Sequence, residues 1–186
     1  MSKRLERTIV THAAPTLAGH KCANLLFWRG RVDDALLGYL EDLNRQLMPK
    51  GVQVRLLHEA EDHALVFVCR PARLERLLQQ SEIRAFLAQR GYPELTAEGC
   101  LQHLSHRLRS GEGFPHEVGV FLDYPLPDVI RYIQDPGCHT CLVGCWKAYT
   151  DEEQAMRRFS LHRKCREVYA DCWRRGFGVA RLTVAA

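Results

Sequence analysis

Two neighbouring segments of alternating apolar and polar residues constrain the fold of this 186-residue chain more than any other feature. Val52, Val54 and Leu56 alternate with polar residues over 52–58, and a second apolar segment follows at 64–69. A period of two places alternate side chains on one face of a β-strand. Because only a short acidic stretch separates the two segments, we expect them to pair as an antiparallel hairpin. A sheet made entirely of parallel strands is therefore not expected.

Segments with helical spacing of apolar residues alternate with further strand patterns. Helices are predicted over 3–13, from an N-cap at Asp33 or Asp34 to Pro49, from Pro71, from an N-cap at Ser81 to Gly91, from an N-cap at Thr96 to Ser110, from Pro125 to about Gln134 and from a capping box that begins at Thr150 to about Arg175. The second of these helices carries an apolar stripe of Leu36, Leu40, Leu43 and Leu47. Strands are predicted over 22–28, 52–58, 64–69, 117–122, 142–149 and 181–184. The sequence therefore predicts a single mixed α/β (α+β) domain over residues 1–186. We expect a five- to six-stranded mixed sheet that includes the antiparallel hairpin, flanked by about six helices.

The composition argues against several classes of protein. Hydrophobic residues make up 46% of the chain and charged residues 26%, which is typical of globular proteins and not of disordered ones. No stretch approaches the roughly 20 apolar residues of a membrane-spanning helix, so no membrane contact is predicted. The net charge of +4 comes without a run of basic residues, so the sequence does not favour nucleic-acid binding.

The N-terminus and the cysteines together predict the cellular location. Residues 1–7 are charged and lack the apolar core of a signal peptide, so we expect a cytoplasmic protein. Thiols are kept reduced there, and the eight cysteines are expected to be core thiols, metal ligands or redox groups without disulfides. Cys165 and Cys172 lie seven residues apart on one predicted helix, about 10 Å along its axis, which is too far for a disulfide.

Three thiols within eight residues form the densest chemical motif of the chain. Cys138, Cys141 and Cys145 follow the spacing C-x2-C-x3-C, and the first pair suits half of a zinc or iron–sulfur site. Gly137 allows the tight turn that would bring two thiolates to one metal ion. The same pair could also work as a redox dithiol, and all three thiols could equally be packing groups. The sequence thus predicts these three cysteines as metal ligands, with zinc or an iron–sulfur cluster as the cofactor.

His116 and Glu117 are candidate catalytic residues at the start of a predicted strand. A histidine can serve there as a metal ligand or as a general acid–base group, and a carboxylate can do the same. Adjacent residues of an extended segment point to opposite faces, so a turn is needed to bring both to one site. Gly119 follows, and a glycine in a strand often marks the close approach of a ligand or another backbone.

A second group of candidates combines cationic and aromatic side chains. Lys147 and Tyr149 are expected on one face of the strand 142–149, with Trp146 on the other. The lysine could bind an anion or hold the tyrosine in a reactive state, which makes both residues catalytic candidates. Lys21, in an irregular segment, could also meet an anionic ligand. Each of these side chains could equally be ordinary surface.

Several runs of residues together resemble a known family. They are the runs 14–21, 70–75 and 114–122, the pairs Tyr124-Pro125 and Asp128-Val129, Gly144, the pair Trp146-Lys147, Tyr149 and the acidic run 151–153. The chain resembles, over nearly its whole length, the domain-of-unknown-function family numbered 3793, small proteins of anaerobic bacteria. The resemblance implies anaerobic physiology, with a link to iron or redox metabolism as one expectation. It implies no established activity.

Two hypotheses about function remain open at this point. The first is a cytoplasmic metal-binding or thiol-redox protein of anaerobic metabolism, with a redox partner protein. Its site would gather where the strands 117–122 and 142–149 lie side by side, and its residues would be His116, Glu117, Cys138, Cys141, Cys145, Lys147 and Tyr149. The alternative is a non-catalytic binding module that holds a small anionic ligand or a protein partner through Lys21, Trp146 and Lys147. Whether the protein is an enzyme stays open.

Overall fold

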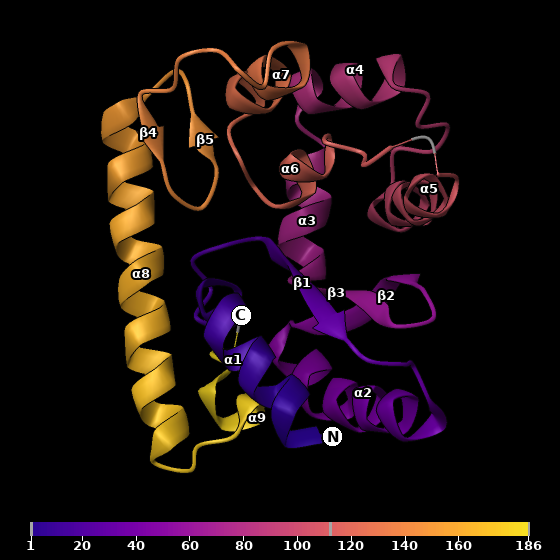
Figure 1. Ribbon diagram of the computed structural model, residues 1–186, viewed down its shortest axis with the longest axis vertical. Helices are drawn as coiled ribbons and strands as arrows, with labels where there is room; N and C mark the ends of the chain where they lie inside the picture. The colour runs from indigo at the N-terminus through magenta and orange to yellow at the C-terminus, as the bar shows by residue number, and fades with distance from the viewer. Residues whose placement is uncertain (1, 112, 186) are drawn as a thin grey trace.

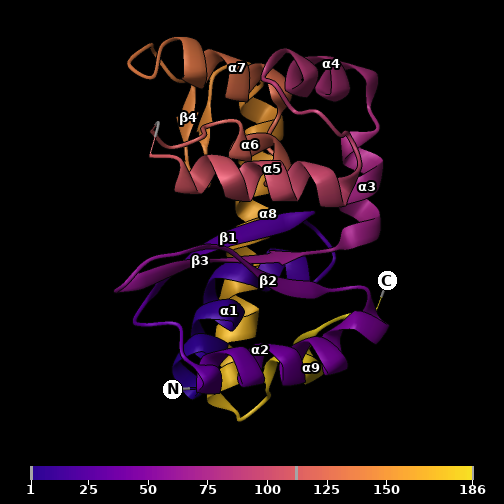
Figure 2. The same ribbon diagram turned by 90° about the vertical axis from the view of Figure 1, so that its right-hand side faces the viewer.

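A three-stranded sheet lies between two layers of helices in the computed structural model, which describes residues 2–111 and 113–185 (Figures 1 and 2). Its strands are β1 (Ala23–Arg29), β2 (Gln53–Glu59) and β3 (His63–Cys69). The helices are α1 (Ser2–Leu17), α2 (Asp34–Leu47), α3 (Pro71–Leu78), α4 (Ser81–Gln89), α5 (Ala97–Arg109), α6 (Val118–Phe121), α7 (Leu126–Gln134), α8 (Glu152–Arg174) and α9 (Val179–Leu182). The 3-10 helix η1 (Met48–Lys50) follows α2, and two short strands, β4 (Leu142–Val143) and β5 (Lys147–Ala148), form a separate hairpin.

β3 is the central strand of the larger sheet and pairs antiparallel with both neighbours, in the order β1-β3-β2. The predicted hairpin of 52–58 and 64–69 is confirmed, and its bounds differ by at most one residue at any end. A β-bulge shifts the register of β2 between Leu56 and His58. Since both pairings are antiparallel, the expectation of a mixed sheet is wrong, whereas the α+β class is confirmed.

Both faces of the sheet are buried, which explains why β3 is apolar at nearly every position. Ala64, Val66 and Val68 belong to a hydrophobic cluster with side chains of α1, α2, α8 and α9. Phe67 and Cys69, on the opposite face, belong to a second cluster with side chains of α3 to α7. The central strand therefore joins two cores, one on each side of the sheet (Figure 2).

The long helix α8 runs beside both layers, along one side of the molecule (Figure 1). Its C-terminal half packs on α1, with Cys165 and Tyr169 in the first core. Its N-terminal half packs against the β4–β5 hairpin through Ala155 and Phe159. Asp151 caps the helix by accepting a hydrogen bond from the Gln154 backbone N–H. α8 thus fixes the hairpin relative to the sheet.

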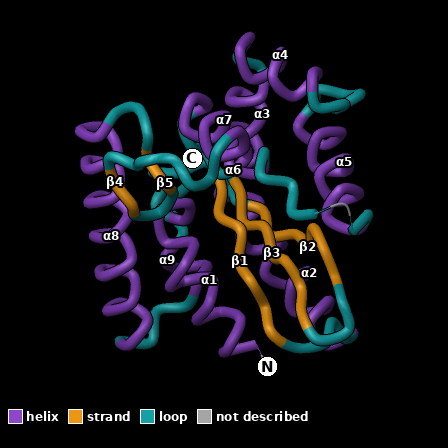
Figure 3. Tube along the Cα trace, turned by 45° about the horizontal axis from the view of Figure 1, so that its top comes forward, coloured by secondary structure: helices purple, strands orange, loops and turns teal. Residues whose placement is uncertain are grey.

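Three predicted strands are corrected by the structure. Residues 118–121 of the predicted strand 117–122 form the short helix α6, and Arg181 and Leu182 of the predicted strand 181–184 lie in α9. The predicted strand 142–149 splits into β4 and β5 (Figure 3). The five- to six-stranded sheet is therefore not formed among the described residues. All four residues of α6 are buried, so apolar residues occur on every side of the segment and their alternation carries no information about a strand.

α1 extends further than predicted, because the helix includes Pro15 and ends at Leu17. Proline was expected to end the helix at residue 13, since it lacks the N–H group that continues the hydrogen-bond pattern. Pro15 lies in the last turn, where few later bonds depend on it, and its carbonyl accepts bonds from the His20 and Lys21 backbone N–H groups. The turn that follows α1 is therefore held close to the helix end.

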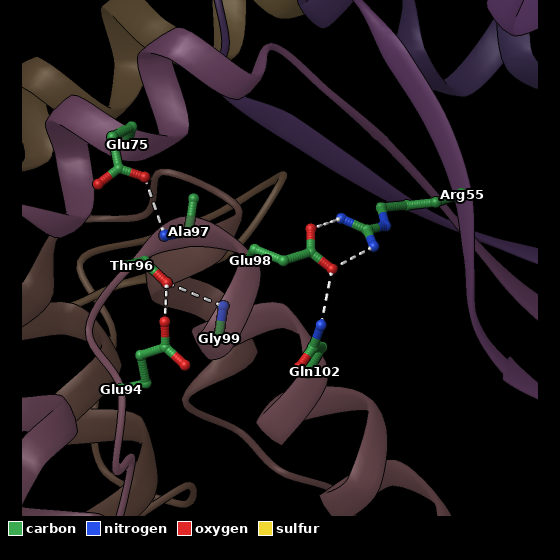
Figure 4. Close-up of polar contacts among 8 residues, drawn as sticks. All are labelled: Arg55, Glu75, Glu94, Thr96, Ala97, Glu98, Gly99 and Gln102. Atoms are coloured by element: carbon green, nitrogen blue, oxygen red, sulfur yellow. Dashed lines mark hydrogen bonds and ion pairs between the residues drawn. The ribbon is translucent and has the colours of Figure 1, made fainter.

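Polar contacts attach α5 to the sheet and to α3 (Figure 4). The two carboxylate oxygens of Glu98 accept hydrogen bonds from the Arg55 guanidinium of β2, at 2.7 and 2.9 Å. These bonds lower the pKa of Glu98 to about 2. Glu75 of α3 accepts a bond from the Ala97 backbone N–H at 2.9 Å, and Thr96 caps α5 as predicted.

Two further expectations concern membranes and thiols. Within residues 2–111 and 113–185, no helix combines the length and the apolar character that a membrane crossing requires. All eight cysteines are free thiols, as predicted. Cys165 is buried and Cys172 partly buried on α8.

Candidate functional site

A cavity of about 440 Å³ lies between α6, α7, the β4–β5 hairpin and the segment before α6. Four aromatic residues contribute to its lining: Phe114, Tyr124, Tyr132 and Trp146. His116 and Lys147 line it as well. Although the segments around residues 116 and 147 are not paired strands, the structure brings these two predicted site residues together with Trp146.

Tyr124 and Trp146 form one aromatic wall of the cavity. Their rings stack with centroids 5.2 Å apart, and the Phe159 ring meets Trp146 edge-on at 4.4 Å. A side chain at Gly144 would overlap the Phe159 ring, so the hairpin can lie this close to α8 only with glycine there. Gly119 is equally confined, since a Cβ atom would lie 2.9 Å from Val129 Cγ2. The groups that approach Gly119 are the side chains of Val129 and Tyr124, whereas a ligand or another backbone was expected beside a strand.

The buried carboxylate of Asp128, in the first turn of α7, attaches the hairpin to the helix layer. Its Oδ2 accepts a hydrogen bond from Trp146 Nε1 at 2.8 Å. Its Oδ1 accepts bonds from the backbone N–H groups of Tyr149 and Thr150 and from the Thr150 hydroxyl, at 2.9, 3.1 and 2.9 Å. Thr150 was expected to cap α8 in a capping box, but its hydroxyl binds Asp128 and Asp151 is the cap. Asp128 therefore positions Trp146 in the cavity wall.

Two basic side chains lie at the exposed rim of the cavity. The Lys147 ammonium donates to the Pro136 carbonyl at 2.9 Å and lies 5.5 Å from the centre of the Tyr132 ring. The His116 ring meets the same Tyr132 ring edge-on, with centroids 5.0 Å apart. Both residues pack on Tyr132 and are available to an anionic group that enters the cavity mouth.

Lys21 lies apart from these residues and does not line the cavity. Its side chain is buried, and its ammonium lies 4.8 Å from the centre of the Tyr124 ring. Burial lowers the pKa of Lys21 to about 8, although Cys145 and Asp123 partly offset the effect. The predicted set of Lys21, Trp146 and Lys147 is thus divided between the cavity and a buried position behind Tyr124.

Two predicted catalytic residues do not reach the cavity. Glu117 is buried and forms an ion pair with Arg107 at 2.5 Å, and it accepts a hydrogen bond from the Tyr92 hydroxyl at 3.1 Å. Its neighbour His116 is exposed and packs on Tyr132, although residues 116–117 lie in a turn and not in the extended segment that was expected. Tyr149 lines a different groove, on the far side of α7. Glu117 therefore has a structural ion pair, and Tyr149 is not beside Lys147 in the cavity.

The three clustered thiols have separate surroundings. The Cys141 thiol donates to the Ala148 carbonyl within the hairpin, whereas Cys145 accepts a bond from Arg166 at 3.7 Å. Cys138 lies in the turn after α7. Across residues 2–111 and 113–185, no three side chains of His, Cys, Asp or Glu are grouped as metal ligands. Zinc or iron–sulfur binding by these cysteines stays a prediction that the structure does not strengthen.

Sequence reasoning missed several residues that shape this region. Tyr132 links both basic side chains, but on α7 it reads as one more partly apolar position. In the sequence Asp128 indicates only a charge that would repel an anion, whereas in the structure its carboxylate accepts four hydrogen bonds. His162 was missed because a histidine in the middle of a polar helix gives no signal of burial, yet it is 1% exposed.

Comparison with known proteins agrees with the resemblance seen in the sequence. A family model described as "Protein of unknown function (DUF3793)" matches residues 9–183. No curated protein and no solved structure matches the chain significantly. All the described cavity-lining residues and all the predicted site residues lie within the matched segment, which spans nearly the whole chain. The chain therefore belongs to this family of proteins of unknown function.

Proposed function

We propose that this protein is a binding module whose cavity holds a small organic anion with a flat, apolar body. The observation that carries the proposal is the joint lining of one cavity by four aromatic rings and two basic side chains. This choice follows the second of the two sequence hypotheses, in which Trp146 and Lys147 bind an anionic ligand.

The size and the lining of the cavity support a small ligand. Its volume of about 440 Å³ falls within the range of sites that hold small molecules, roughly 300–1,000 Å³. The Tyr124–Trp146 pair offers a flat apolar surface, and aromatic rings favour stacked or edge-on packing with another ring. A planar ligand would bury its body against these rings.

The charges at the cavity favour an anionic head group. Among the described residues that line the cavity, the only carboxylate is that of Asp128, which is buried and engaged by four hydrogen bonds. Lys147, at the rim, is exposed and can leave the Pro136 carbonyl for a ligand. An anion at the rim would therefore meet a cation and no free acidic group among the described lining residues.

The test uses 2-naphthoate as the probe and uncharged 2-naphthalenemethanol as its neutral counterpart. We expect saturable binding of both by titration calorimetry, with the naphthoate bound about fivefold more tightly. That ratio corresponds to about 1 kcal/mol for a partly exposed ion pair. Lys147→Gln should remove the preference for the anion and leave binding of the neutral probe unchanged.

A matched control is Lys164→Gln, which removes an exposed lysine of α8 away from the cavity. Val143→Trp places a bulky side chain at an exposed position of the rim and should weaken both probes. The proposal fails if neither probe binds saturably, or if Lys147→Gln and Lys164→Gln have the same effect on the naphthoate.

A further inference from the structure

Four basic side chains converge behind the aromatic wall, outside the cavity. Arg158, His162 and Arg166 are spaced four residues apart on α8 and so lie along one face of the helix. This face is covered by the β4–β5 hairpin and by the turn after α1, which carries Lys21. His162 and Lys21 are 1% and 2% exposed, whereas the two arginines are partly exposed.

One of the two buried members of this basic cluster, His162, lacks hydrogen-bond partners among the described residues. Both ring nitrogens of His162 are buried without a partner among the described residues. The side chain of Lys21 is buried nearby, and its ammonium lies over the ring of Tyr124. Buried polar groups in proteins are almost always hydrogen-bonded, so the unpartnered imidazole of His162 suggests a ligand that supplies the missing bonds.

The surroundings of His162 are strongly electropositive. Burial, together with Lys21, Arg158, Arg166 and His20, lowers the pKa of His162 to about 4. Among the described residues, Asp123 is the carboxylate that acts on Lys21, and it already pairs with Arg158 at 3.3 Å. Arg166 has only the Cys145 sulfur as a side-chain acceptor among the described residues. Three cations thus face one carboxylate, which leaves an excess of two positive charges.

We propose that Lys21, Arg158, His162 and Arg166 form a binding site for a tetrahedral oxyanion of the phosphate class. The donors come from α8 and from the turn after α1, so they surround the anion from more than one side. Guanidinium groups match the geometry of phosphate oxygens, and a lysine adds a point charge. The excess of two charges equals the charge of a phosphate dianion. Entry is from the side of the partly exposed arginines and Cys145.

This site goes beyond the proposed function and is independent of it. None of its four basic residues lines the aromatic cavity. The two regions share only the Tyr124–Trp146 wall, with Lys21 stacked on the first ring and Arg158 at 5.1 Å from the centre of the second. The anion site can therefore bind its ligand whether or not the cavity binds one.

The test is titration calorimetry of the full chain with inorganic phosphate at pH 7, at constant ionic strength maintained with sodium chloride. We expect saturable binding of one phosphate per chain. Arg166→Gln should weaken it at least tenfold, because a cation that contacts the anion is removed. Arg163→Gln is the matched control, since Arg163 is exposed on the same helix and should leave binding within twofold of the wild-type protein.

Lys21→Met provides a second variant that does not depend on the arginines and should also weaken phosphate at least tenfold. Methyl phosphate in parallel distinguishes free phosphate from a phosphate monoester, according to which of the two binds more tightly. The proposal is overturned if phosphate does not bind saturably, or if Arg166→Gln and Lys21→Met bind it as tightly as Arg163→Gln does.

Discussion

Replacement of Asp128 by alanine tests whether one buried carboxylate holds the β4–β5 hairpin in place. The substitution removes the acceptor of four hydrogen bonds, three of them from residues 149–150 and one from Trp146. It leaves the rest of α7 intact, because the side chain lies in the first turn and makes no other hydrogen bond with a described residue. We expect the hairpin to detach from the helix layer before the sheet unfolds.

The expected loss follows from what each donor can do without the carboxylate. Thr150 is exposed and Tyr149 partly so, hence their groups can turn to water and cost about 0.5 kcal/mol each. Trp146 is 8% exposed, and its Nε1–H would be left unpaired at a cost of about 1–3 kcal/mol. The negative charge near the N-terminus of α7 adds about 0.5 kcal/mol. With three such groups on residues 149–150, these contributions predict a loss of about 3–5 kcal/mol in the free energy of unfolding.

Urea unfolding followed by far-UV circular dichroism measures this loss, and hydrogen exchange of residues 141–150 locates it. Asp34→Ala is the matched control, because Asp34 is an exposed acid in the first turn of α2 and shares only the helix-terminus effect. We expect faster exchange in the hairpin of Asp128→Ala and none in the control. A loss below about 1 kcal/mol with unchanged exchange would refute the assigned role of Asp128.

Three other predictions follow from individual side chains. Gly144→Ala should displace the hairpin from Phe159 and lower the melting temperature, and an unchanged temperature would show that the close contact is absent. Arg55 lowers the pKa of Glu98, so the Glu98 carboxylate stabilises the folded protein fully above pH 4.5 and loses this effect as the pH falls toward 2. In urea unfolding at pH 6, the free energy of unfolding of Glu98→Gln should therefore lie below that of the wild type by under about 1 kcal/mol. At pH 2 the difference should be smaller. The pKa of His162 is lowered from 6.5 in the unfolded chain to about 4 in the folded protein, so the unfolded chain binds the proton more readily. In phosphate-free buffer the free energy of unfolding should therefore fall by about 3 kcal/mol from pH 6.5 to 4. His162→Leu should flatten this dependence on pH.

Several of the elements that the sequence predicted correctly have one buried face. The alternation of β2 and the leucine stripe of α2 each reflect a single boundary between core and solvent. The Asp33 and Thr96 caps were also readable, because a short polar side chain before an apolar helix has few other uses. Local chemistry was sufficient in these cases.

The elements that failed are short segments whose surroundings are set by tertiary packing. α6 is buried on all sides in the second core, so its apolar residues fit a strand pattern by chance. The segment 142–149 was expected to be one strand, but Gly144 turns the chain against Phe159 and only two residue pairs remain. Neither the all-round burial nor the contact with α8 can be inferred from residues nearby in the chain.

The candidate site shows the same division between local and distant information. His116, Trp146 and Lys147 were named from their chemistry, and the structure places them at one cavity although the paired strands expected to join them do not exist. Their convergence results from α7 and its Asp128, which attach the hairpin beside α6. A residue type can thus be nominated from the sequence, while the partner that positions it requires the fold.

The basic face of α8 illustrates what a sequence pattern conceals most completely. A stripe of arginine, histidine and arginine at four-residue spacing is what the exposed side of a helix usually shows, because burial of such groups costs free energy. In this protein the hairpin and the turn that carries Lys21 cover the stripe, and the lowered pKa values of Lys21 and His162 show that the folded state disfavours their charged forms. Apolar side chains at positions 21 and 162 would avoid the free-energy cost of burying these polar groups. A bound anion would offset this cost, because it supplies hydrogen-bond acceptors and balances the positive charge. We therefore expect phosphate to stabilise the folded protein through the same residues that destabilise it without a ligand.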